Sequence, residues 1–139
     1  MKYLFSTSKN FGRSVYIVAA KRTPIGSFNS KLSSFGAIEL GGHAIRGALD
    51  SINLDPKEVD EVVLGNVLGA GLGQAPARQA SLRGGIGIEV PCTTINKVCS
   101  SGLKSLAYGA QSIALEQADI VVGGGFESMS RAPHILLNV

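Results

Sequence analysis

One cysteine stands where a strand pattern gives way to a helix pattern. Cys99 ends the β-branched run of residues 93–98 and is followed by two serines and a glycine, in the stretch TTINKVCSSGLKS. Catalytic groups in open α/β sheets gather at the carboxyl ends of strands, and the first turn of a helix offers unpaired N–H groups and a positive dipole end. These surroundings favour the nucleophilic thiolate, and the N–H of Cys99 can donate to an oxyanion. The local pattern alone also fits a buried cysteine without chemistry.

The other residues with catalytic or metal-binding potential give weaker patterns. Cys92 follows Pro91 ahead of the same predicted strand, away from any helix start. His43 lies in a helical pattern among glycines and alanines and His134 lies in a loop, so we predict packing or surface roles for both. A metal site needs about four ligands at characteristic spacings, which these four residues do not provide. We therefore expect no metal.

Composition narrows the class of protein. The chain has 139 residues, a net charge of +3, 45% hydrophobic residues and two cysteines. One domain of that size buries a real core, and two cysteines favour reduced thiols in an intracellular protein over a disulfide framework. No apolar run approaches the ~20 residues that cross a bilayer, and no basic surface is interleaved with aromatics, so we expect neither membrane nor nucleic acid as a partner. Residues 1–14 lack acids and predict a basic tail or a mitochondrial transit segment.

The hydrophobic pattern alternates between strands and helices. Short apolar or β-branched runs predict strands at residues 15–20, 62–67, 92–98 and 120–122, the last running into a glycine turn. Helical spacing predicts helices at residues 37–52, 74–85 and 100–117, with a short turn opened by Asp55 and Pro56. The order βαβαβαβ predicts an α/β fold with a mostly parallel sheet and helices on both faces.

Four stretches resemble the thiolase family. They are VYIVAAKRTPIGSF (residues 15–28), LGNVLGAGLGQAPARQA (64–80), PCTTINKVCSSGLKS (91–105) and GGGFESMSRAPH (123–134). They follow the family's order over residues 15–137, and INKVC resembles the acetyl-CoA C-acetyltransferase, or acetoacetyl-CoA thiolase, branch. Phe126 stands where the family more often has methionine. The resemblance implies the N-terminal half of a thiolase-like fold, with residues 15–139 as a truncated domain.

The resemblance also implies a reaction and its partners. Cys99 would take an acetyl group from acetyl-CoA as a thioester, and a second acetyl-CoA would condense with it to give acetoacetyl-CoA and CoA, or the reverse. Coenzyme A would be substrate and product, with no permanently bound cofactor and no cofactor-binding residue assigned in this segment. The full-length form would be a homo-oligomer, in the mitochondrion or the cytoplasm, with the basic tail favouring the mitochondrion.

Parts of the family pattern have no counterpart before Val139. The activating histidine, a second cysteine, an oxyanion-hole asparagine, a fifth strand and a cover over the helix after Cys99 belong to the family's later segments. The resemblance therefore predicts a fragment whose own activity is in doubt, with an exposed apolar helix face. Two alternatives stay open: a non-catalytic product that associates with full-length subunits, and a 3-ketoacyl-CoA thiolase of different chain length.

Overall fold

Helices and strands alternate along the chain in a computed structural model that describes residues 12–137. The helices are α1 (Ala37–Ser51), α2 (Pro76–Arg83) and α3 (Ser101–Ala114), and the strands are β1 (Glu61–Gly65), β2 (Cys92–Ile95) and β3 (Val121–Gly125). Two short 3₁₀ turns, η1 (Pro56–Glu58) and η2 (Met129–Arg131), complete the order. The α/β class and the three helices predicted from the sequence are confirmed, and the turn at Asp55 is the short η1.

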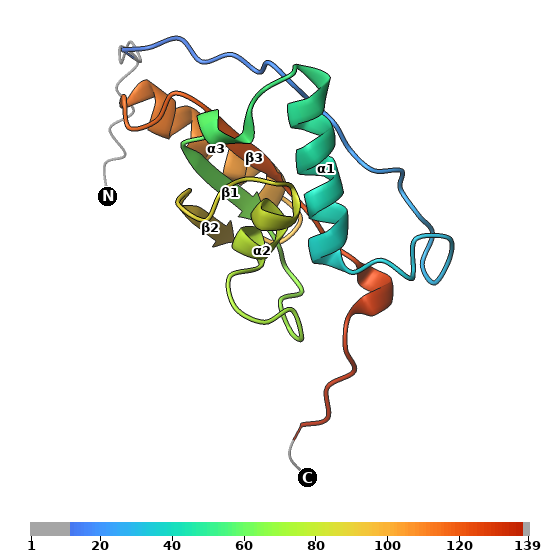
Figure 1. Cartoon of the computed structure of the whole chain (residues 1–139). Coiled ribbons are helices and arrows are strands. Elements are labelled where there is room, and N and C mark those ends of the chain that lie inside the picture. The colour runs from blue at the N-terminus through green and yellow to red at the C-terminus, as the bar shows by residue number, and fades with distance from the viewer. Residues whose placement is uncertain (1–11, 138–139) are drawn as a thin grey trace, which may run out of the picture.

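The strands form one parallel sheet in the order β2-β1-β3. The helices cover both faces, as predicted: α2 packs on β1 and β2 and carries α1, whereas α3 packs on β1 and β3 from the other side (Figure 1). All three strands therefore end at the same edge of the sheet, and the segments that follow them meet there.

The face under α1 and α2 carries the apolar core. Val62 and Leu64 of β1 point into it and are 0% and 3% exposed. The core around them consists of Ala37, Ile45, Leu49, Val59, Ala77, Ala80, Ile86, Val90 and Phe126. This cluster closes one side of the sheet with residues of this chain alone.

The face under α3 is built from small residues instead. A side chain on Gly65 would come within 2.6 Å of Ser101 Cβ, and one on Gly123 within 2.9 Å of Leu106. The glycines at 123–125, predicted as a turn, are in fact part of β3 and pair with β1. The helix lies close to two of them, Gly123 and Gly125. Ser105 on α3 is fully buried, accepts a hydrogen bond from Gly124 N–H (2.8 Å) and lies 2.7 Å from Gly124 O.

The strand predicted at residues 15–20 is wrong for this structure. That segment runs extended past α1 without joining the sheet (Figure 1), and Tyr16 and Ile17 are 77% and 78% exposed. Residues 15–19 and 120–123 line the same hollow of about 540 Å³. The segment therefore lies near the free edge of β3 but does not pair with it as a strand. A strand needs a hydrogen-bonded neighbour, which this one lacks. Of the predicted basic segment 1–14, residues 1–11 lie outside the described residues.

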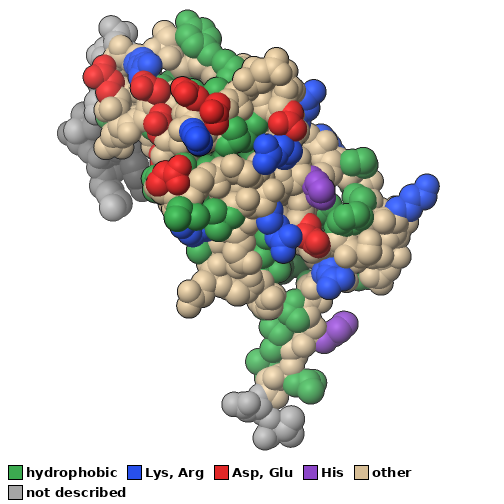
Figure 2. All heavy atoms as spheres, in the orientation of Figure 1, with side chains coloured by type: hydrophobic (Ala, Val, Ile, Leu, Met, Phe, Trp, Pro, Cys, Tyr) green, Lys and Arg blue, Asp and Glu red, His purple; other side chains and the backbone are tan. Residues whose placement is uncertain are grey.

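The described surface carries mixed charge. Figure 2 shows most Asp and Glu side chains at the upper left of the face that it presents and Lys and Arg side chains spread over that face. Among residues 12–137, no helix combines the length and the apolar character needed to cross a bilayer.

Candidate active site

Cys99 lies in a tight turn between β2 and α3. The predicted strand at 92–98 ends earlier, at Ile95, because the chain turns back on itself at Val98, which has a left-handed φ of 51°. That conformation is uncommon for a β-branched residue and carries strain of the kind found at functional sites. Asn96 Oδ1 accepts a hydrogen bond from Val98 N–H (2.9 Å) and helps to hold the turn.

Two serine hydroxyls fasten this turn to the start of the helix. Ser101 Oγ accepts from Lys97 N–H (2.7 Å) and donates to Val98 O (2.6 Å), and Ser100 Oγ donates to Lys97 O (2.9 Å). The α-helix begins at Ser101, two residues after Cys99, as the sequence predicts. Among the described residues, the N–H of Cys99 has no hydrogen-bond acceptor. Cys99 is also exposed among the described residues.

The segments that follow the three strands enclose a hollow of about 590 Å³ beside this turn. Cys99 lines it, and so do residues from the ends of β1 and β3. The lining consists of Gly65, Val67, Leu68, Val98, Ser101, Gly102, Gly125, Phe126, Glu127 and Met129. A nucleophile with its own unpaired backbone N–H and apolar side chains therefore meet at one hollow, an arrangement suited to acyl transfer.

Glu127 is a residue of this site that the sequence analysis missed. Its Oε2 accepts from Val67 N–H (2.8 Å), and its Oε1 accepts from Leu68 N–H (3.2 Å) and from Asn66 Nδ2 (2.9 Å). Asn66 is buried and also donates to Phe126 O (3.2 Å). One carboxylate thus ties the segment after β3 to the segment after β1, across 60 residues of sequence. A lone acid among glycines and serines gives no pattern that reveals this.

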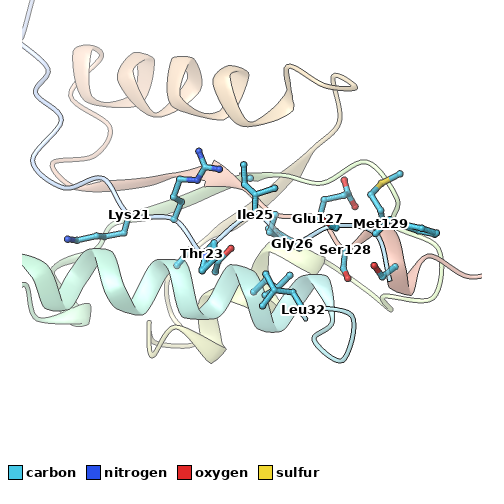
Figure 3. Close-up of a pocket in the computed structure, with 17 residues that line it drawn as sticks. Lys21, Thr23, Ile25, Gly26, Leu32, Glu127, Ser128 and Met129 are labelled. Carbon is cyan, nitrogen blue, oxygen red and sulfur yellow. The ribbon is translucent and has the colours of Figure 1, made fainter. Parts of the chain in front are cut away.

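A second hollow, of about 530 Å³, lies on the other side of the segment after β3 (Figure 3). Residues 21–28 form one wall, and residues 125–130 form another that it shares in part with the Cys99 hollow. In Figure 3 the labelled side chains of Glu127 and Ser128 point to opposite sides of this segment. Ser128 Oγ donates to Phe35 O (3.0 Å), which fastens the segment towards α1.

The remaining candidate residues lie elsewhere. Cys92 is half-buried in β2, with its Sγ 3.3 Å from Val90 O. His43 is exposed on α1 with its ring edge against Phe35, and His134 is exposed after η2. None of the three lines the Cys99 hollow. Among residues 12–137, no three His, Cys, Asp or Glu side chains gather in a way that could hold a metal ion.

A model of the family described as "Thiolase, N-terminal domain" matches residues 15–138. This chain belongs to the thiolase family. Among its relatives are the cytosolic acetyl-CoA acetyltransferase ERG10 of Gibberella zeae, 55% identical over 125 residues, and the mitochondrial acetyl-CoA acetyltransferase of Danio rerio, 50% identical over 138 residues. The matches cover 90% and 97% of this chain but 32% and 33% of those proteins. This thiolase chain thus spans about a third of the length of the curated relatives it matches.

A solved thiolase has the same fold. The crystal structure of Acat5 thiolase from Ascaris suum in complex with coenzyme A superposes with a TM-score of 0.86 at 45% sequence identity. The match covers 89% of this thiolase chain and 32% of the Ascaris chain. The three-stranded parallel sheet with its helices is therefore part of the thiolase fold, as the resemblance implied.

Proposed function

We propose that this thiolase chain carries the acyl-accepting half of an acetyl-CoA acetyltransferase site, with Cys99 as the nucleophile. The observation that carries the proposal is an exposed thiol two residues before α3, facing a hollow at the carboxyl ends of three parallel strands. The names of the relatives support acetyl-CoA as the acyl donor, in preference to a 3-ketoacyl-CoA of another chain length. They also cover both proposed compartments, the cytoplasm and the mitochondrion.

The first half-reaction uses groups that this chain holds. The Cys99 thiolate attacks the thioester carbonyl of acetyl-CoA, a new C–S bond forms, and the bond to the CoA sulfur breaks to release CoA as a thiolate that takes up a proton. The negative charge that develops on the carbonyl oxygen needs donors, and the N–H of Cys99 is open to that role. The product is an acetyl-Cys99 thioester and free CoA.

The second half-reaction completes the proposal for the whole protein. A second acetyl-CoA loses a proton at its α-carbon, and the carbanion attacks acetyl-Cys99 to give acetoacetyl-CoA and the free thiol. The thiolase resemblance assigns the proton-transfer groups to later segments, and the relatives are about three times as long as this chain. We therefore propose that condensation, thiolysis and homo-oligomer formation belong to a protein of that length.

One observation favours a second candidate function, association with longer thiolase subunits. The outward side of α3 is apolar, with Leu103 72% and Leu106 42% exposed. An exposed apolar patch of this kind marks a contact surface. This candidate requires no chemistry at Cys99, so a direct test of acyl transfer distinguishes the two functions.

Isotope exchange tests the first half-reaction. The chain is incubated with acetyl-CoA and labelled CoA, and label entering acetyl-CoA is measured, because this exchange needs only a reversible acetyl-enzyme. Exchange that is lost in the Cys99→Ser variant and kept in the matched Cys92→Ser variant supports the proposal. An unaltered chain that is folded and shows no exchange contradicts it and leaves association as the function of these residues.

A further inference from the structure

A hydrogen-bonded path runs from Glu127 across the ends of all three strands. It starts at the carboxylate, which accepts from Val67 N–H, and continues through Val67 O, which accepts from Asn96 Nδ2 (3.4 Å). The other end of the Asn96 amide accepts from Val98 N–H (2.9 Å). The path therefore ends at the strained residue that immediately precedes Cys99.

The Glu127 carboxylate is held by neutral donors rather than by a cation. Its partners are two backbone N–H groups and the Asn66 amide, and no Lys, Arg or His forms an ion pair with it among the described residues. Hydrogen bonds to an ionised acceptor are about twice as strong as neutral ones. A carboxylate with three such donors at a half-buried position therefore fixes the segment after β1 more firmly than a neutral side chain could.

The same carboxylate lies at the wall of the Cys99 hollow. Glu127 and Cys99 both line it, while Ser128 is fastened on the opposite side by Phe35. Glu127 thus lines both hollows, and its oxygens accept hydrogen bonds from the segment after β1. Glu127 does not need to contact a reacting group to affect the position of Cys99.

We propose that Glu127 is a positioning residue for Cys99, acting through Val67 and Asn96 on the turn at Val98. The proposal rests on the proposed function in that it makes Cys99 the group that must be placed. Loss of the carboxylate frees the segment after β1, loosens the Asn96 amide and lets the Val98 turn relax. Cys99 then loses its fixed place in the hollow, two residues before the start of α3.

A double-mutant cycle tests this path in the 139-residue chain without requiring acyl transfer. Alkylation of Cys99 by iodoacetamide is followed peptide by peptide in the unaltered chain, in Glu127→Gln, in Asn96→Ala and in the double variant. Each single change is expected to slow Cys99 by about fivefold, and the double variant to be no slower than either one, since both break the same path. Glu58→Gln, an exposed carboxylate in η1, is the matched control and is expected to leave the rate unchanged.

The other results overturn the proposal. An unchanged or faster Cys99 rate in Glu127→Gln shows that the carboxylate acts as a local charge or not at all, and slowing that multiplies in the double variant shows two independent effects. Alkylation of the half-buried Cys92 in the same molecules reports unfolding. If Glu127→Gln does not fold, Glu127→Asp, which keeps the charge but shortens the side chain, takes its place in the cycle, and an unchanged Cys99 rate in it overturns the proposal. Acetylation of Cys99 by acetyl-CoA is measured separately, so its absence contradicts the proposed function and leaves the alkylation result standing.

Discussion

The two faces of the sheet are held to their helices by different means. Under α1 and α2, branched side chains such as Val62 and Leu64 are buried in an apolar cluster. Under α3, the contact includes glycines in the strands and Ser101, Ser105 and Gly109 in the helix, while Leu103 is largely exposed. A surface helix normally buries its large apolar side chains against the sheet, whereas the buried residues of α3 are small: Ser101, Ser105, Gly109 and Ala114.

The two faces therefore have different roles: one stabilises the fold, and the other positions the candidate site. The α1 and α2 face supplies most of the apolar burial that stabilises the fold. The α3 face contributes close backbone approach and the hydrogen bonds of Ser105, which fix the start of the helix and hence Cys99 relative to the strand ends. The side of α3 that carries Leu103 is exposed.

Truncating one leucine on each face gives the largest expected contrast. Leu64→Ala removes a side chain that is 3% exposed and is expected to lower the free energy of unfolding by about 3 kcal/mol. Leu103→Ala removes one that is 72% exposed and is expected to change it by less than about 0.5 kcal/mol. Urea unfolding followed by circular dichroism measures both. Equal losses of stability would show that α3 buries its leucines and would contradict the difference between the two faces of the sheet.

A methyl group added at Gly65 tests the close approach of α3. Its Cβ would lie 2.6 Å from both Cβ and the backbone carbon of Ser101, so Gly65→Ala is expected to cost about 2 kcal/mol and to displace the start of the helix. Gly47→Ala on α1 is the control, because a Cβ there meets nothing within 4 Å and is expected to stabilise by about 0.5 kcal/mol. The same unfolding assay decides, and a neutral Gly65→Ala would contradict the close-approach account.

The smallest expected effect is the pH dependence of the stability that Asp60 contributes. Asp60 directly precedes β1, at the opposite end of the strands from Cys99. Hydrogen bonds from the backbone N–H of Ile120 and of Asp119 lower the pKa of Asp60 below its usual value. Asp60 therefore stabilises the fold fully above the unfolded-state pKa of about 3.9, and this contribution is lost as pH falls through the lower folded-state value. Asp60→Asn should destabilise by less than about 1 kcal/mol at neutral pH, since the group is exposed.

The pH dependence of that variant is its own check. The difference in unfolding free energy between the unaltered chain and Asp60→Asn is expected to shrink towards zero as the pH falls below about 3.9. A difference that stays constant from neutral to acid pH would mean that the carboxylate charge at Asp60 does not hold β3 to β1.

Local sequence patterns predicted most of the fold, and the misses have identifiable causes. The helices at α1, α2 and α3 follow from apolar spacing, and Pro76 and Gly84 mark the ends of α2 as expected. Residues 15–20 have the composition of a buried strand but have no neighbouring strand, and composition cannot supply one. The glycines at 123–125 signal a turn locally, whereas their role in β3 depends on a helix that lies about 20 residues earlier.

At the candidate site, the nucleophile was predictable and its supports were not. The position of Cys99 follows from a strand pattern that meets a helix pattern, and the helix does begin at Ser101. The left-handed Val98 gave no signal, because a β-branched residue ordinarily argues for continued strand. Glu127 gave none either, because its partners, two backbone N–H groups and the Asn66 amide, lie 59 to 61 residues away in the sequence.

Peptide-resolved mass spectrometry after brief exposure to acetyl-CoA tests the acyl-accepting role of Cys99. We expect an acetyl group on Cys99 and none on Cys92, from the folded chain and without added protein. Equal labelling of both cysteines would indicate nonspecific thiol acetylation. No label on Cys99, in a chain that circular dichroism shows to be folded, would contradict the claim that these residues carry the acyl-accepting half of the site.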